Sequence, residues 1–218
     1  MKTIKKALFE IIIVFIGVSF AFILNNWTEE SSKSKKEQFY ISGYLKDLTA
    51  NSEELSLIME QDSIWLEKIR PHIHLLSSNS YKADSAMSLV LLIGTLNNCT
   101  IIENTNNLII NSGEFNLISD NIIQNNIIQM NTAIENVIHI EEFVKNYFND
   151  HTLPFIKMNF DLLNRQFNSS EILKDVLLKN EVLIFTQLKA QRLASYQELY
   201  LKIDSLNSTM GEYLITIK

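Results

Sequence analysis

Two closely spaced histidines are the first candidate ligands in this chain. His72 and His74 are separated by one residue and follow Pro71, so two imidazoles are available to one metal ion. Protein metal sites need further donors, and no acidic side chain accompanies the pair. The spacing alone therefore does not predict a metal site.

A second candidate combines acids with a histidine on one helix face. Glu135, His139 and Glu142 are spaced i, i+4 and i+7, which places all three on the same side of a helix. Carboxylate-bridged metal sites in helical bundles draw such residues from several helices at once. No matching Glu-x-x-His motif occurs on another predicted helix, and Glu141 stands beside the three residues. We expect a solvated charged face and no metal.

The chain also lacks the usual signs of a nucleophile or a phosphate site. Cys99 is the one cysteine, and it stands neither at a predicted helix start nor among basic residues that would lower the pKa of its thiol. With five glycines in the chain, a glycine-rich phosphate loop is not available. We predict no catalytic residue, no cofactor and no metal, and therefore no enzyme.

The composition favours long helices. The 218 residues are 46% hydrophobic but include only five glycines and two prolines, fewer turn residues than a β-rich fold of this length needs. We therefore predict an all-α protein. The formal net charge of −6 and the lack of a basic stripe argue against a nucleic-acid surface.

One apolar stretch near the N-terminus governs the remaining predictions. Residues 7–27 read ALFEIIIVFIGVSFAFILNNW, and between Ala7 and Leu24 only Glu10 is ionisable. As a helix, this stretch would span ~27 Å, close to the ~30 Å hydrocarbon core of a bilayer. We predict a transmembrane helix over residues 7–27, with Trp27 as its interfacial anchor.

The charges around this stretch predict its orientation. Residues 1–6 contain Lys2, Lys5 and Lys6 and no acid, so this basic tail should stay cytoplasmic. Residues 28–218 would then form a periplasmic domain, attached by a single pass to the inner (cytoplasmic) membrane.

A cleaved signal peptide is the alternative to an anchor. Ser19-Phe20-Ala21 fits a small-x-small cleavage site. The apolar run continues beyond that site to Leu24, and Trp27 follows where an interfacial aromatic residue would stand, which favours an uncleaved anchor. In both cases the main domain is exported.

Glu10 has two interpretations. Its carboxylate can reach the headgroup region beside the N-terminal lysines as a tolerated interfacial acid. Alternatively, it belongs to a packing face of the transmembrane helix, in which small residues allow another helix to approach closely. That face consists of Glu10, Val14, Gly17, Ala21 and Leu24. The second interpretation predicts self-association or docking to another membrane protein.

From residue 39 onward the apolar spacing predicts a helical bundle. A seam with spacings of three and four runs from Leu45 to Leu76, interrupted by Ser52 and by Asp62, which we expect at the edge of the stripe. Because Pro71 lies within this run, the helix is expected to end or kink near Arg70.

The rest of the chain carries further helical patterns. We predict helices over residues 82–96, over 103–110 with a stop at Gly113, from a Ser119 N-cap to about Asn149, from Pro154 to about 165, and from Glu171, after a cap at 168–170, to the end. These elements predict an antiparallel up-and-down bundle with two long helices and shorter ones inserted between them.

Two stretches resemble a known family. Residues 9–30, FEIIIVFIGVSFAFILNNWTEE, and the Glu-containing helix after them resemble the DUF6090 family, uncharacterised single-pass membrane proteins of Bacteroidota. The family's membrane segment ends in Asn-Asn-Trp-Asn-Glu; here Thr28 replaces the Asn that follows Trp, and Phe9 replaces a usual Gly. Ser112–Asp120 is a second, weaker match. The resemblance implies the topology described above and no activity.

Three classes of function remain open. The first is a structural or protein-interaction module of the bacterial envelope. The second is a ligand-sensing bundle that signals through a partner membrane protein, because residues 1–6 are too short for an output domain. The third, an enzyme, is disfavoured because no nucleophile–base or metal constellation is found. We predict the first, with the bilayer, a second copy or another envelope membrane protein as partner.

Overall fold

The described part of the chain is mostly helical and contains one short β-hairpin. The computed structural model describes the backbone of residues 2–81 and 85–217, and the side chains from Ile12 onward within these ranges. The helices are α1 (Lys2–Ser77), α2 (Ala86–Ile93), α3 (Asn104–Ser112), α4 (Asn121–Tyr147), α5 (Leu153–Asn159) and α6 (Val176–Thr216), and the strands are β1 (Phe160–Asp161) and β2 (Gln166–Phe167). The all-α fold class is confirmed.

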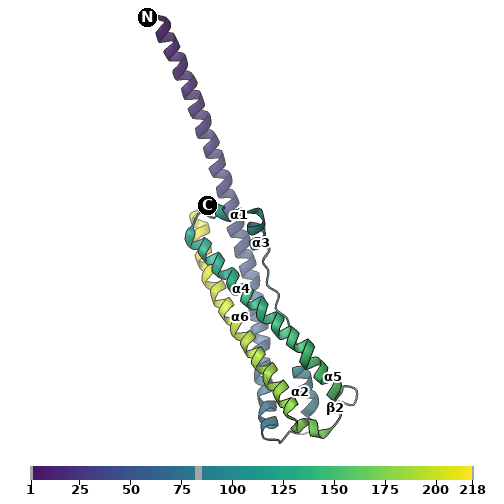
Figure 1. Cartoon of the computed structure of the whole chain (residues 1–218). Helices are drawn as coiled ribbons and strands as arrows, with labels where there is room; N and C mark the ends of the chain where they lie inside the picture. The colour runs from purple at the N-terminus through teal and green to yellow at the C-terminus, as the bar shows by residue number, and fades with distance from the viewer. Residues whose placement is uncertain (1, 82–84, 218) are drawn as a thin grey trace.

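Helix α1 runs without a break from the apolar N-terminal stretch into the bundle. It contains 76 residues, and its first part extends beyond all other elements (Figure 1). By length and composition, this helix is apolar enough to cross a membrane, and the apolar window is not buried inside the protein. The polar residues 28–36 are part of the same helix, so no flexible linker separates the two parts.

Pro71 does not end α1, which continues to Ser77. The expected helix end near Arg70 is therefore wrong. Proline removes the hydrogen bond to the carbonyl of Glu67, but both residues are exposed, so water can satisfy that carbonyl.

The bundle has three long helices. α1 and α4 both run away from the N-terminal end of the molecule, and α6 returns between them toward it (Figure 1). α6 packs against both of the other long helices. After α1 ends, the chain runs back toward the N-terminal end through α2, an extended segment (residues 94–103) and α3, and α4 begins only then. The arrangement is therefore not a simple up-and-down bundle.

The predicted apolar stripes form the core. On α4, the predicted stripe from Ile123 to Val144 is buried, and on α1 the seam contributes Leu48, Leu55 and Ile69. Two clusters result, one near the C-terminal end of α6 and one at the end of the bundle that lies far from the N-terminus.

Side chains of α1 hold the extended return segment in place. The Asn51 amide donates to the carbonyl of Ile102 (2.8 Å) and accepts from its N–H (2.7 Å), and Asp47 accepts from the N–H of Thr105 (2.7 Å). Asn51 is 1% exposed. The buried polar residue of this turn is therefore Asn51, and not Ser52, which the apolar seam had placed there. A Cβ on Gly43 would lie 2.9 Å from Oγ1 of Thr105, so only glycine permits this close approach.

Several helix ends differ from the prediction. Gly113 ends α3 with φ of +69°, as expected, but Asp120, not Ser119, caps α4 through the N–H groups of Ile122 and Ile123. Ser119 instead binds Glu37 of α1. The predicted cap at 168–170 is present, since Ser169 caps a 3-10 helix (Ser170–Lys174), but α6 itself begins only at Val176, where Asp175 accepts from the N–H of Leu177 at 2.9 Å.

The predicted helix to residue 165 is also wrong. α5 ends at Asn159, and the antiparallel pair β1–β2 follows. Phe160 and Phe167 face each other across this pair, with ring centroids 5.0 Å apart, and both are buried. Two antiparallel strands place Phe160 and Phe167 opposite each other on one face, where their rings can pack together. This aromatic contact favours a hairpin over a helix here.

Asn51→Ala should lower the free energy of unfolding by about 2 kcal/mol, because the N–H and carbonyl of the half-buried Ile102 lose their partners. Chemical denaturation of the full-length protein in mild detergent would measure this. The neighbouring change Ser52→Ala should stay within about 0.5 kcal/mol of the native protein. Equal effects of the two substitutions would contradict the assigned role of Asn51.

Candidate functional site

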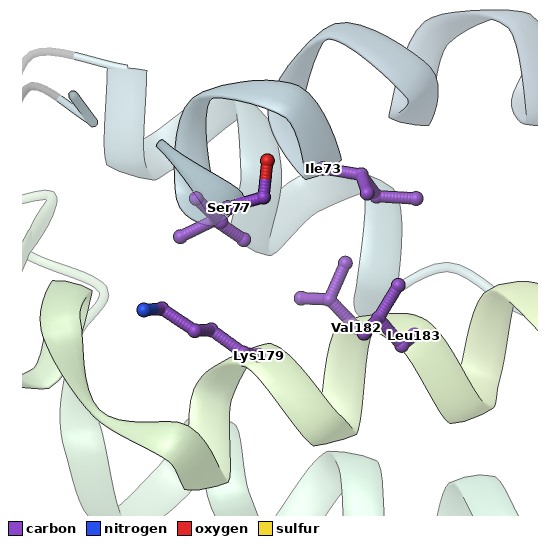
Figure 2. A pocket seen from close by; sticks show the side chains of 6 residues that line it. Ile73, Ser77, Lys179, Val182 and Leu183 are labelled. Carbon is purple, nitrogen blue, oxygen red and sulfur yellow. The ribbon is translucent and has the colours of Figure 1, made fainter. Parts of the chain in front are cut away.

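The hollow between the end of α1 and the start of α6 offers little room for a ligand. It measures about 110 Å³ and is lined by Ile73, Leu76, Ser77, Lys179, Val182 and Leu183 (Figure 2). Its one charged group, Lys179, donates to the side chain of Asn79 at 2.7 Å. Ligand pockets usually measure about 300–1,000 Å³. A hollow of this size is too small for most organic ligands.

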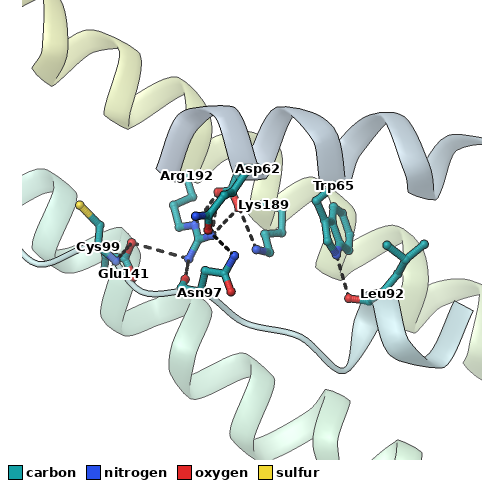
Figure 3. Close-up of polar contacts among 9 residues, drawn as sticks. Asp62, Trp65, Leu92, Asn97, Cys99, Glu141, Lys189 and Arg192 are labelled. Carbon is teal, nitrogen blue, oxygen red and sulfur yellow. Dashed lines mark hydrogen bonds and ion pairs between the residues drawn. The ribbon is translucent and has the colours of Figure 1, made fainter. Parts of the chain in front are cut away.

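The most unusual polar site lies inside the bundle, where α1 meets α6. Asp62 of α1 is fully buried and binds two cations of α6 (Figure 3). The guanidinium of Arg192 donates to both carboxylate oxygens, with Nε–Oδ2 3.0 Å and Nη2–Oδ1 2.7 Å, and Lys189 Nζ donates to Oδ1 at 2.9 Å. This paired geometry fits the fork of arginine to a carboxylate.

Arg192 also joins the site to the rest of the bundle. Its Nη1 donates to the backbone carbonyl of Asn97 in the return segment at 2.6 Å and lies 3.6 Å from Oε1 of Glu141 on α4. One guanidinium therefore contacts α1, α4 and the return segment from its position on α6. We call Asp62, Glu141, Lys189 and Arg192 the central ion cluster.

The charges of the central ion cluster balance. It contains two carboxylates and two cations, of which Asp62, Lys189 and Arg192 are almost fully buried. The aromatic rings of Trp65 and Tyr196 lie beside the cations, 5.4 Å from Lys189 Nζ and 5.5 Å from the Arg192 guanidinium carbon. Burial, and then the neighbouring Arg192, lowers the pKa of Lys189, although Asp62 opposes that effect.

Glu141 is the member of the cluster nearest to solvent. Its side chain is 15% exposed and lines an open groove of about 210 Å³ with Cys99. Burial raises the pKa of Glu141, while Arg192 partly opposes the rise. Burial, together with the charge of Glu141, also raises the pKa of the Cys99 thiol to about 12. Cys99 is therefore a protonated thiol, as its sequence setting led us to expect.

Two further buried carboxylates lie on other levels of the bundle and bind hydroxyl groups instead of cations. Glu37 accepts from the N–H of Ser119 (2.6 Å) and the hydroxyl of Tyr213 (2.6 Å), which ties the end of α6 to α1. Glu181 accepts from Tyr147 (3.1 Å) and from Thr152 in the π-helical turn (Phe148–Thr152) after α4.

The structure does not bring together the side chains that the sequence analysis weighed as candidate metal ligands. His72 Nδ1 lies 2.5 Å from the hydroxyl of Tyr81, and His74 is exposed. Glu135, His139 and Glu142 lie on the exposed face of α4, in line with the expected solvated face, but Glu141 turns inward to the central ion cluster. No group of three or more metal-binding side chains occurs in the described ranges.

The predicted packing face of the apolar stretch is free of intramolecular contacts where it is described. Val14 and Trp27 are 64% and 69% exposed, Ala21 and Leu24 are also exposed, and no atom approaches Gly17 within 4 Å of an added Cβ. The side chain of Glu10 lies outside the described residues. The face is thus open to a neighbouring helix or to lipid.

The prediction for Asp62 was wrong, because it is buried and not at the edge of the stripe. A signal for its partners is present in the sequence. Lys189 and Arg192 occupy positions within the three-four apolar spacing of the last helix, between Phe185 and Tyr196. Two cations in one buried stripe and an acid in another predict an ion pair between the two helices.

No family model, curated protein or solved structure matches the chain. The resemblance to the DUF6090 family stays a prediction.

The central ion cluster is suited to holding helices and not to chemistry. Each carboxylate oxygen of Asp62 accepts from a cation, and Arg192 has acceptors on three sides. Groups that are paired in this way are not free to transfer protons or to attack a substrate. The cluster acts as a brace that fixes α1, α4 and α6 against one another.

Asp62→Asn should lower the free energy of unfolding by about 3–5 kcal/mol, because it leaves two buried cations without their main counter-charge. Denaturation of the full-length protein in detergent would measure the loss. Replacing the whole central ion cluster together (Asp62→Leu, Glu141→Gln, Lys189→Met, Arg192→Met) should restore most of it, since no uncompensated charge is then buried in the middle of the bundle.

Glu67→Gln is the matched control for Asp62→Asn, because Glu67 is an exposed acid of the same helix. It should change the free energy by less than about 0.5 kcal/mol. A brace role is contradicted if Asp62→Asn is no more harmful than this control.

Glu141 should make stability fall as the pH rises above its ordinary carboxyl value. Because its pKa is raised from 4.5 in the folded protein, the folded state keeps a proton that the unfolded chain releases. Its contribution to the free energy of unfolding is therefore full below pH 4.5 and is lost as the pH rises through the raised pKa.

The difference between the native protein and Glu141→Gln isolates this effect. Denaturation at a series of pH values should give a difference in unfolding free energy that is constant below about pH 4.5 and declines above it. His72, whose pKa burial lowers, titrates in a neighbouring range but is present in both proteins and cancels. A difference that is constant at every pH would refute the assignment.

Proposed function

We propose that this protein is a membrane-anchored structural or protein-interaction module of the bacterial envelope. Residues 7–27 hold it in the inner membrane, residues 1–6 remain in the cytoplasm, and the bundle formed by residues 28–218 lies in the periplasm. The proposal includes membership of the DUF6090 family, supported by the motif of residues 9–30.

The continuity of α1 is the observation that carries this proposal. Ten apolar side chains between Ile12 and Leu24 stand exposed on the same helix that forms one side of the bundle. Leaving them in water would cost on the order of 15–30 kcal/mol, which a bilayer would remove. The stretch from Trp27 to Ser77 then carries the far end of the bundle ~75 Å from the membrane surface.

Exposed apolar residues at that far end support an interaction role. Leu162 and Leu163, in the turn between β1 and β2, are 58% and 94% exposed, and Val176 and Leu177, at the start of α6, are 63% and 66% exposed. In Figure 1 these elements lie at the opposite end of the molecule from the N-terminus. Leu162–Leu163 and Val176–Leu177 are each a pair of adjacent exposed apolar residues, and exposed apolar surface of this kind supports a contact role.

A ligand sensor is the less favoured alternative. It needs a pocket with polar groups between the long helices, but the hollows at α1–α6 and α4–α6 measure about 110 Å³ each. The larger hollows, of about 210 Å³, 250 Å³ and 270 Å³, are open surface grooves, and all are below the roughly 300 Å³ of ordinary ligand sites.

Spheroplasts that express the full-length protein provide the test. The native chain should sediment with the membranes, lose residues 28–218 to added protease, and retain envelope proteins when it is crosslinked and purified. The double change Ile16→Arg, Phe20→Arg, which adds about 2.5–3.5 kcal/mol per charge to membrane insertion, should reduce the amount of the chain in the membranes and, with it, the amount of crosslinked envelope proteins.

Leu57→Asp is the control for that experiment. Leu57 is an exposed apolar residue of α1 outside the span, so this variant should fractionate and bind as the native protein does. A native chain that is soluble, or whose domain resists protease until the spheroplasts are lysed, would disprove the topology. A membrane-bound chain without any protein partner would disprove the interaction role.

A further inference from the structure

The first ~6 turns of α6 are reversed in polarity. Between Val176 and Gln197, the charged residues Glu181, Lys189 and Arg192 are buried, and Lys179 is half-buried and hydrogen-bonded to Asn79. Every exposed side chain of this stretch is uncharged. The chain as a whole is 20% charged, so an outer helix face of this length without charge is unusual.

The outer face follows the spacing of a two-stranded coiled coil. Its centre is a line with alternating steps of four and three, which we call the α6 outer seam: Val176, Asn180, Leu183, Gln187, Ala190 and Ala194. The amides of Asn180 and Gln187 both fall at one position of the heptad, and the apolar side chains of Val176 and Leu183 fall at the other. Ala190 and Ala194 leave room for a second helix to approach closely.

We propose that the α6 outer seam pairs with the same seam of a second copy of this chain, in parallel and in register. The seam residues are uncharged in both copies, and the neighbouring Lys179 is hydrogen-bonded to Asn79 of its own copy, so no like charges meet along the centre of the pair. Asn180 and Gln187 would each face their own counterparts, and an amide at this heptad position favours two parallel strands in register.

The membrane supplies the geometry of the pair. This step rests on the topology proposed above, in which α1 holds every copy in the same bilayer at the same height and orientation. Two α6 helices then run parallel at equal height, so each seam residue meets itself across a twofold axis. Confinement to one membrane also raises the effective concentration of the partner.

The size of the seam explains why the membrane is needed. From Val176 to Ala194 the seam is ~27 Å long, and a helix is ~10 Å wide. The footprint is well below the ~800 Å² per partner of a standard interface. We therefore expect a dimer in membranes and a monomer in dilute detergent solution.

Single cysteines in the full-length chain test the pairing. In a Cys99→Ser background, Leu183→Cys and Asn180→Cys should each form a crosslinked dimer when native membranes are oxidised. Lys68→Cys is the control, because Lys68 is exposed on α1 and lines the groove beside α2, away from the seam. Adding Leu183→Glu to Asn180→Cys should lower the crosslinked yield at least about tenfold, since it places a charge opposite its own copy.

The outcomes separate this inference from the proposed function. Equal crosslinking at Lys68→Cys and at the seam, or no crosslinking at the seam in membrane-bound protein, would overturn the pairing alone. A crosslinked product whose mass is not twice that of the chain would mean that another protein covers the seam. Loss of the native chain from the membrane fraction would overturn the topology instead. The Leu183→Glu variant must melt at the native temperature, which excludes unfolding as the cause of a lower yield.

Discussion

The burial of Asp62 is the constraint on which the bundle depends. A carboxylate at this depth needs cations, and both come from α6, where Lys189 and Arg192 are separated by one helical turn. A shift of α6 by one turn, ~5.4 Å, would separate these charges, so the cluster fixes the register of α6 on α1. Because Arg192 also contacts Asn97 and Glu141, the same residue positions the return segment and α4.

Because Asp62 needs buried cations, the distribution of charged residues between the inner and outer faces of α6 is also affected. A helix usually keeps its charges outside, but here the inner face carries them to satisfy Asp62, while Val176, Leu177, Leu183 and Ile184 remain outside. The central ion cluster and the uncharged outer seam are therefore two sides of one helix. This connects the internal packing of the bundle with the surface that we propose for pairing.

Buried carboxylates occur along the whole bundle, and each is satisfied differently. Glu37, nearest to the apolar stretch, binds Ser119 and Tyr213; Asp62, in the middle, binds cations; and Glu181, toward the far end, binds hydroxyls. Since Glu37 and Asp62 belong to the unbroken α1, the contacts of both rest on the helix that continues into the proposed membrane span. In that topology, a movement of the span would reach the bundle without a flexible joint.

The sequence by itself determined the helical class, the apolar N-terminal stretch and the buried stripes of the long helices, because these depend on composition and local periodicity. Gly113 was also predictable, since a left-handed helix end favours glycine. The tertiary structure alone decided that α1 continues through Pro71, that Phe160 and Phe167 pair across a hairpin, and that Asn51 holds the return segment. It also decided that Asp62 meets Lys189 and Arg192, residues more than 120 positions away. Such contacts arise from helices that approach in space, and local spacing carries no direct record of which residues will meet.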